Sequence, residues 1–188
     1  MARVRSPEKR NAILQAAVHE IAEVGLGAAT AKIARRAGVA SGTLFTYFAN
    51  KEELLNELYL DLKSEVYTRL NADFPHKASL ERRARHLWSR SLDWAIEFPE
   101  KRKVSARLNL SDVITPETRM RTAAQRGTID RTFGELGTRG SLRGLPAGFA
   151  AATMAAMQEA TSEFIAKQPK QRKQLIEQGF QVFWRAMR

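Results

Sequence analysis

Apolar residues recur at helical spacing along most of the chain, and the first such stretch is bounded by clear start and stop signals. Ser6, Pro7 and Glu8 give a hydroxyl cap, a proline at the first helical position and an acid in the first turn. Gly25 is the expected end. The apolar face between them is Ile13, Ala17, Ile21 and Val24, with Leu14 and Val18 beside it. This pattern predicts one amphipathic helix.

Two shorter helical segments follow, each with only a narrow apolar stripe. We expect Thr30 to cap the first and Ser41 to cap the second, with Gly38 turning the chain between them. The stripe of the first is Ile33, Ala34 and Ala37, and that of the second is Leu44 and Phe48 with Val39 nearby. Neither segment is large enough to be stable alone. With the first helix they are predicted to close a three-helix unit.

A longer helix is expected from residue 51 to residue 71. Asn50 and Glu53 form a variant of the capping box at its start, and the segment around Pro75 ends it. Its apolar positions are Leu54, Leu58, Leu62, Val66 and Leu70. Because no flexible linker is evident, we expect this helix to join two domains. They are predicted as residues 1–50 and residues 51–188.

The remaining sequence also predicts helices and no strands. We expect them over 80–98, from Pro99 through Leu108, from Thr115 to Leu136 without a break, over 147–167 and over 170–187. A glycine-rich loop is expected over 137–146. No segment alternates as a strand does, and no hairpin signal or internal repeat is present. The predicted fold class is therefore all-α.

Charge narrows the choice of partners. The 188 residues carry a formal net charge of +11 and a sequence pI of about 10.4. An acidic macromolecule is the expected partner, although charge alone does not choose between DNA, RNA and anionic lipid. The chain has no cysteine, which excludes disulfides and thiolate metal sites and suits a cytoplasmic protein. No stretch approaches the roughly 20 consecutive apolar residues of a membrane span, so no membrane partner is expected.

Catalytic and metal-binding patterns are missing from the sequence. No nucleophile elbow, phosphate-binding glycine loop or dinucleotide-binding glycine pattern occurs. The three histidines, His19, His76 and His86, lie far apart and form no pair with ligand spacing. We therefore expect no enzyme activity, no metal and no cofactor.

The two short helices carry a string of residues whose spacing resembles the DNA-binding domain of the TetR family. The matching positions are Thr30, Ile33, Ala34, Ala37, Gly38, Val39, Gly42, Thr43, Leu44, Phe45, Tyr47, Phe48, Lys51 and Leu54. The resemblance implies an N-terminal helix-turn-helix domain followed by a larger helical domain for ligand binding and dimerisation. It also implies a homodimeric, ligand-responsive repressor of transcription that binds a palindromic operator in duplex DNA.

The resemblance also implies roles for individual residues. Ser41 to Phe48 would be the recognition helix, in which Gly42 lets the backbone approach DNA and the threonines offer a hydroxyl or a methyl group to base edges. A lysine in the first helical turn opposes the helix dipole by roughly 0.3 to 1 kcal/mol, which suits Lys51 if a phosphate lies beside it. The predicted DNA-binding set is Thr30, Lys32, Arg36, Ser41, Gly42, Thr43, Phe45, Thr46, Tyr47 and Lys51.

Two positions depart from the family pattern. Phe45 stands where the family usually has tyrosine, so the ring is left to pack on a sugar or on a thymine methyl group. Ala31 stands where some members carry a basic residue. Ahead of the first helix, the cations Arg3, Arg5, Lys9 and Arg10 reach phosphates or a minor groove, or else form a solvated tail.

For the second domain, the apolar residues leave more than one interpretation open. A pocket for a small-molecule effector of unknown identity could be lined by Trp88, Leu92, Trp94, Leu108, Met120 and Met154, with Arg107 or His86 as the polar anchor. Alternatively, these residues could be core. The last two helices are expected to pair with those of a second subunit. Their candidate residues, which are equally open to an intramolecular role, are Ala151, Met154, Ala155, Ala160, Phe180, Phe183, Trp184 and Met187.

An alternative function is a basic helical module that binds RNA or an anionic membrane surface. Cations outside the helix-turn-helix motif favour it: Arg82, Arg83, Arg85, Arg119, Arg121, Arg126, Lys170, Arg172 and Lys173. Charge reversal at Lys32 and Lys51 distinguishes the two functions, because only the DNA reader depends on those two residues.

Overall fold

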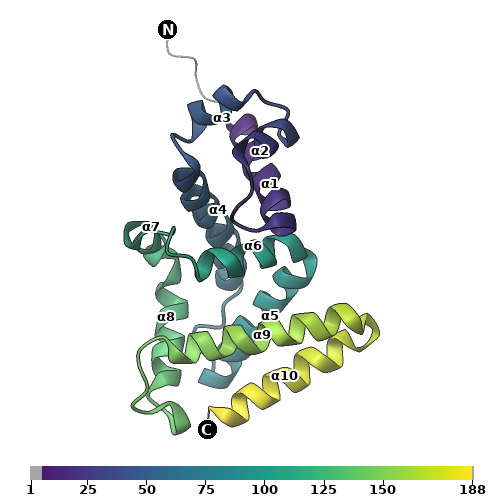
Figure 1. Cartoon of the computed structure of the whole chain (residues 1–188). Coiled ribbons are helices and arrows are strands. Elements are labelled where there is room, and N and C mark those ends of the chain that lie inside the picture. The colour runs from purple at the N-terminus through teal and green to yellow at the C-terminus, as the bar shows by residue number, and fades with distance from the viewer. Residues whose placement is uncertain (1–5, 188) are drawn as a thin grey trace. The chain divides into compact units, whose positions relative to one another are not determined.

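The computed structural model describes residues 6–187, so Arg3 and Arg5 of the basic arm lie outside the described residues. All regular elements in this part of the chain are helices, as predicted (Figure 1). The chain divides into two compact units. The first unit comprises residues 6–64 with Pro99–Thr122, and the second comprises Glu65–Phe98 with residues 123–187.

The first unit is built on helix α1 (Pro7–Val24), which contacts α2 (Thr30–Arg36) and α6 (Pro99–Asn109). The hydroxyl of Ser6 accepts the N–H of Lys9 at 3.3 Å, and Gly25 ends the helix at φ 84°, so both predicted boundaries are confirmed. Ile13, Ala17 and Ile21 are fully buried, but Val24 is 58% exposed. The expected burial of Val24 was wrong, because the chain turns away into Gly25 directly after it.

Helices α2 and α3 (Ser41–Tyr47) have no side-chain caps. Their N-cap residues are Ala29 and Ala40, and the predicted caps Thr30 and Ser41 are the first helical residues instead. That correction has a structural cause, since each helix begins one residue earlier than the hydroxyl preference suggested. These two seven-residue helices therefore depend on packing rather than on capping.

Helix α4 (Lys51–Asn71) begins as predicted. The side-chain oxygen of Asn50 accepts the N–H of Glu53 at 2.8 Å, and the Glu53 carboxylate accepts the N–H of Ala49 at 2.6 Å. The exchange is a capping box in which the carboxylate reaches one residue further back than usual. The first part of α4 belongs to the first unit and its end to the second. The functional division at residue 50 stays a prediction, because α6 and α7 (Pro116–Arg121) also belong to the first unit.

The single helix expected from Thr115 to Leu136 is two helices, α7 (Pro116–Arg121) and α8 (Ala123–Gly137). The predicted cap is confirmed, since the Thr115 hydroxyl accepts the N–H of Thr118 at 3.1 Å. The prediction of one continuous helix was wrong. Thr122 ends α7 with its hydroxyl donating to the carbonyl of Arg119 at 2.8 Å, and α8 belongs to the other compact unit.

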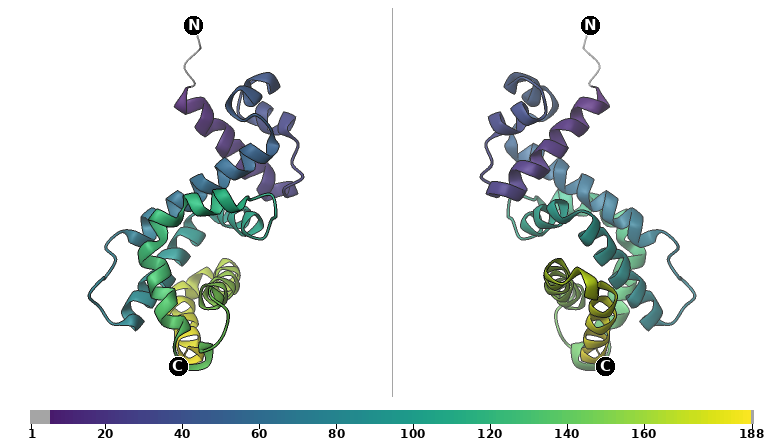
Figure 2. Two further views of the ribbon diagram at one scale, coloured as in Figure 1. Left: turned by 90° about the vertical axis from the view of Figure 1, so that its left-hand side faces the viewer. Right: turned by 90° about the vertical axis from the view of Figure 1, so that its right-hand side faces the viewer.

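The second unit consists of the end of α4, α5 (Leu80–Glu97), α8, α9 (Phe149–Lys167) and α10 (Arg172–Ala186). Helices α9 and α10 pack side by side (Figure 2). Trp88 of α5 stacks on Phe183 with ring centroids 6.0 Å apart, and its indole N–H donates to the carbonyl of Ile176 at 2.9 Å. Gly179 permits this packing, since a Cβ there would lie 2.8 Å from the Trp88 ring. The core therefore joins α5 to α10.

Candidate nucleic-acid interface

The rotation of α3 decides which of its residues face outward. Leu44 and Phe48, four apart, are 0% and 1% exposed, as the apolar stripe predicted. Ser41, Gly42, Phe45 and Thr46 are exposed, while Thr43 and Tyr47 are half-buried. All six residues of α3 that were predicted to bind DNA therefore lie on its accessible side or at the margin of that side.

Two hydroxyl groups of α3 already have partners inside the protein. The Thr46 hydroxyl donates to the carbonyl of Gly42 at 3.1 Å, which leaves its lone pairs and methyl group to face outward. The Tyr47 hydroxyl accepts the backbone N–H of Ser6 at 3.0 Å. A phenol that accepts one bond keeps its own proton to donate, so Tyr47 can still bind an external acceptor while it ties the start of α1 to α3.

The three predicted phosphate-binding cations differ in their surroundings. Lys32 is exposed on α2, and Lys51 is half-buried in the first turn of α4. Arg36 instead donates from Nε to the buried carboxylate of Glu20 at 2.7 Å, with Glu23 at 3.5 Å from Nη2. The hydrogen bond to Glu20 raises the pKa of Arg36 above its ordinary value. Arg36 thus ties α2 to α1. Its partner Glu20 was not predicted from the sequence.

Arg35 is the cation that sequence reasoning left out. It is exposed near the end of α2, three residues after Lys32, and among residues 6–187 it forms no ion pair. Residues three apart are neighbours on a helix surface, so Arg35 and Lys32 present two charges together. The helical period alone would have indicated this, but it did not show which of the adjacent arginines is paired.

Glu57 of α4 connects the interface to the rest of the first unit. Its carboxylate binds Arg10 of α1 at 2.6 Å and Arg121 of α7 at 2.9 Å. The Arg10 guanidinium also lies 5.7 Å from the ring centroid of Phe48, at the end of α3. One carboxylate on α4 therefore bridges α1 and α7, and Arg10 extends the link to the end of α3.

Helix α6 and the segment after it are also bound within this unit. Arg107 donates to the carbonyl of Ile21 and, at 3.2 Å, to that of Ala22, at the end of α1. The buried amide of Asn56 donates to the carbonyl of Val113 at 2.8 Å and accepts the N–H of Thr115 at 3.1 Å. The predicted role of Arg107 as a ligand anchor is corrected, because its guanidinium binds the last carbonyls of α1.

Known proteins share both the motif and the fold. Residues 13–58 match the family described as bacterial regulatory proteins, tetR family. A TetR family transcription regulator from Shewanella sp. PV-4 is 28% identical, with a TM-score of 0.81 over 97% of this chain and 98% of that one. Residues 13–58 therefore form a TetR-type DNA-binding domain, and the whole chain is similar in fold to a TetR family regulator. Its all-α fold and its helix-turn-helix are those of transcription regulators.

Two further matches come from Bacillus subtilis. The fatty acid metabolism regulator protein of strain 168 is 41% identical over 68 residues, which are 36% of this chain and 35% of that protein. The match thus spans about a third of the curated relative. The transcriptional regulator FadR, solved in complex with stearoyl-CoA, is 22% identical, with a TM-score of 0.66 over 92% of this chain and 96% of that one. At this identity the likeness shows the fold alone.

The six residues predicted to line an effector pocket divide between the two units. Leu108 and Met120 belong to the first unit and the other four to the second. Met120 is 67% exposed, whereas Trp88, Leu92 and Met154 are core residues of the second unit. Trp94 is buried and its indole N–H donates to Glu65 at 2.8 Å. Most of these side chains therefore fill the core of their own unit, and a pocket lined by all six stays a prediction.

The other predicted ligand anchor is also engaged elsewhere. His86 Nε2 lies 3.0 Å from the carbonyl of Leu70 in the last turn of α4, and the ring of Phe74 meets it edge-on. Burial is the main cause that lowers the pKa of His86. His86 therefore holds the end of α4 against α5 inside the second unit.

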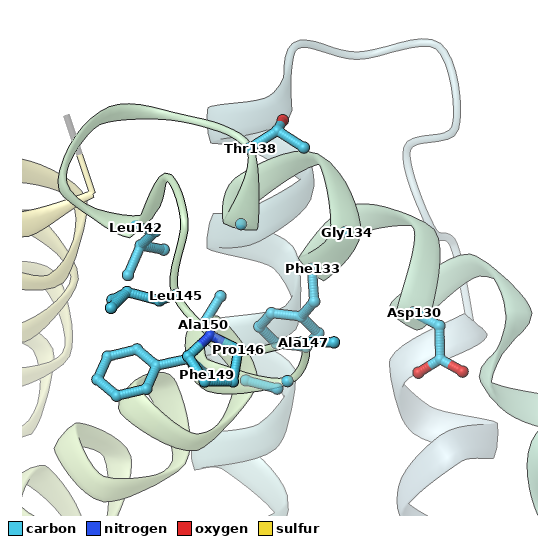
Figure 3. Close-up of a pocket in the computed structure, with 13 residues that line it drawn as sticks. Asp130, Phe133, Gly134, Thr138, Leu142, Leu145, Pro146, Ala147, Phe149 and Ala150 are labelled. Carbon is cyan, nitrogen blue, oxygen red and sulfur yellow. The ribbon is translucent and has the colours of Figure 1, made fainter.

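A cavity of about 440 Å³ lies where α8 ends and α9 begins (Figure 3). Its apolar wall comes from Phe133, Leu142, Leu145 and Phe149, and Asp130 stands at one side with its carboxylate. Leu145 and Phe149 remain 43% and 46% exposed. The glycine-rich segment was expected only to be a loop. The leucines of this segment, which lie between glycines, were the one sequence feature indicating that the segment also lines a cavity.

The outer face of α9 and α10 carries an apolar groove of about 250 Å³. Phe164 and Val182, which line it, are 52% and 59% exposed. Of the residues predicted for dimer contacts, Met154, Phe180, Phe183 and Met187 are instead buried in the core of their own unit. Helical spacing alone did not predict which apolar residues of α10 would pack against Trp88.

Metal ligands and membrane spans are absent from the described part of the chain. Residues 6–187 contain no group of three or more histidine, aspartate or glutamate side chains that could hold a metal ion. No helix among the same residues is long and apolar enough to cross a membrane.

Proposed function

We propose that this protein is a sequence-specific, DNA-binding transcriptional repressor that acts as a homodimer on a palindromic operator and responds to a ligand. The observation that carries the proposal is the presentation of α3. Leu44 and Phe48 anchor its inner side, while Ser41, Gly42 and Thr46 remain accessible on the outer side. A short helix held in this way, on a basic three-helix bundle of α1, α2 and α3, can enter the major groove of DNA.

The phosphate contacts are assigned to groups that flank α3. Lys32 and Lys51 supply charge, and the Tyr47 hydroxyl retains a proton to donate after it accepts the Ser6 N–H. Thr30, at the first position of α2, adds a hydroxyl. Contacts of this type hold the register of a protein on the duplex and make its affinity depend steeply on salt.

A second copy of the chain is the proposed occupant of the α9–α10 groove. Exposed Phe164 and Val182 give this face an apolar centre on two long adjacent helices. A pair of identical faces related by a twofold axis makes a closed dimer. Such a dimer supplies the two recognition helices that half-sites roughly 34 to 36 Å apart require.

An effector is assigned to the cavity between α8 and α9. Its volume of about 440 Å³ lies within the usual range of small-molecule sites, and its wall is largely apolar, so a small molecule with an apolar body fits it. Stearoyl-CoA is the ligand of the Bacillus subtilis FadR, whose likeness to this chain is one of fold. A ligand that prefers one conformation of residues 51–188 would shift DNA occupancy by its differential affinity.

Selection of bound duplexes from a random pool tests the proposal. The purified protein should enrich a palindrome, and addition of an effector should abolish the enrichment. Lys32→Glu combined with Lys51→Glu should remove binding, because two phosphate contacts per protomer become repulsive. Lys170→Glu combined with Lys173→Glu, at two exposed positions of the second unit, provides the control for net charge. Tight binding of RNA or anionic vesicles that survives the double reversal would favour the alternative function.

A further inference from the structure

The recognition helix lacks every side chain that reads a base pair by two hydrogen bonds. The sequence of α3 is Ser-Gly-Thr-Leu-Phe-Thr-Tyr, with no arginine, lysine, asparagine, glutamine or acid. Bidentate readout of guanine uses arginine or lysine, and readout of adenine uses asparagine or glutamine. On α3, direct base contacts are therefore left to hydroxyl groups and to apolar contact.

Two of the hydroxyl groups are weak candidates for reading a base. The Thr46 proton is bound by the carbonyl of Gly42, and Tyr47, which keeps its proton, is held at the start of α1 by Ser6 and is assigned to phosphate. Phe45 lies beside Thr46 and is 45% exposed, the largest apolar group on the accessible side of α3. Its ring has no hydrogen-bonding atom, so it can discriminate bases only by apolar contact.

We propose that Phe45 reads a thymine methyl group in each half-site of the operator. The inference rests on the proposed function and adds the chemistry that the reader selects. Thymine is the only standard base that presents a methyl group in the major groove, so an apolar ring at this position favours it over the other three. Buried Leu44, next in the chain, fixes the rotation of α3 and thereby the direction of the Phe45 side chain.

Replacement of single thymines by deoxyuridine in the selected operator tests this inference, because the exchange removes the methyl group and leaves the base pair intact. One thymine per half-site should be sensitive. Loss of one buried methyl contact corresponds to about a fourfold weaker Kd, and loss of both to about fifteenfold. The Phe45→Ala protein should bind the thymine and uracil duplexes equally. Its unfolding midpoint, measured in parallel, should match that of the wild type, since Phe45 is exposed.

Thr46→Ser is the matched control, since it removes the neighbouring methyl group and keeps the hydroxyl. The inference is overturned if Thr46→Ser, rather than Phe45→Ala, abolishes the sensitivity to uracil. It is also overturned if the wild-type protein ignores uracil at every position while Phe45→Ala weakens binding to both duplexes alike, as for a ring packed on a sugar. In both cases enrichment of a palindrome still supports the proposed function. If no duplex is enriched, both proposals fail.

Discussion

The α2–α3 face and the α9–α10 face both leave side chains accessible, but with opposite chemistry. Around α3 the accessible groups include cations and hydroxyls, and Phe45 is the only large apolar side chain exposed among residues 30–51. The groove on α9 and α10 is lined mainly by apolar groups, among them exposed Phe164 and Val182. A polar, basic face attracts phosphate in water, whereas an apolar face is stabilised when a similar face covers it. The contrast separates a surface for nucleic acid from one for a second protein chain.

The interiors of the two units also differ. Both have a buried apolar core and ion pairs between helices, such as Arg36–Glu20 in the first unit and Arg83–Glu135 in the second. The second adds a cluster of rings that meet around Trp88. Charged contacts between short helices fix their relative orientation, while ring packing resists any change of volume. Substitutions should therefore act by different physical routes in the two units.

The largest effect should come from placing charge on the apolar face. Phe164→Glu combined with Val182→Glu should convert the proposed dimer to a monomer, because two carboxylates per protomer would lose water at the interface. Affinity for the palindrome should fall by more than tenfold, since only one half-site is then held. Sedimentation equilibrium measures the first change and a binding titration the second. Gln174→Glu, exposed on α10 outside the groove, is the control. A double variant that stays dimeric would refute this assignment of the interface.

A smaller effect is expected from overfilling the core behind that face. Gly179→Ala should cost about 1 to 3 kcal/mol of unfolding free energy, because the new methyl group would press on the Trp88 ring. Gly127→Ala in α8 meets no atom within 4 Å and should be neutral or stabilising by up to about 1 kcal/mol. Urea titrations compare the two proteins. Equal stability of the two variants would show that Trp88 moves aside without cost.

The smallest effects should separate two cations of α2. Arg36→Met should lower the unfolding midpoint, because the buried Glu20 carboxylate loses its partner, and should leave the salt dependence of DNA binding unchanged. Lys32→Met should do the reverse. It should reduce the slope of log K against log salt by about 0.9 per protomer and leave the midpoint nearly unchanged. If Arg36→Met alone reduced the salt slope, Arg36 would be a phosphate contact after all.

Local signals predicted the boundaries of α1 and the start of α4, but not the caps of α2 and α3. Ser6, Gly25 and the pair Asn50–Glu53 act where the sequence indicates, because caps and positive φ angles depend on a few neighbouring residues. The burial of Leu44 and Phe48 followed from helical spacing for the same reason. These short-range relations also define which side of α3 is accessible, and so most of the candidate interface.

Long-range contacts were not predictable in this way. Nothing local distinguishes Arg36, which binds Glu20, from Arg35 beside it, which forms no ion pair among residues 6–187. The break at Thr122 and the burial of the predicted pocket residues likewise depend on which unit each segment joins. Packing partners distant in sequence decide these outcomes.

The sequence by itself determined the helical class, the positions of most helices and the outward side of α3, since each follows from the helical period and from terminal signals. Only the tertiary structure decided which charges remain available to DNA, which apolar stripe of α9 and α10 stays uncovered and where a cavity opens. Those properties depend on which residues distant in sequence contact each surface. The local sequence pattern of a segment does not specify those contacts.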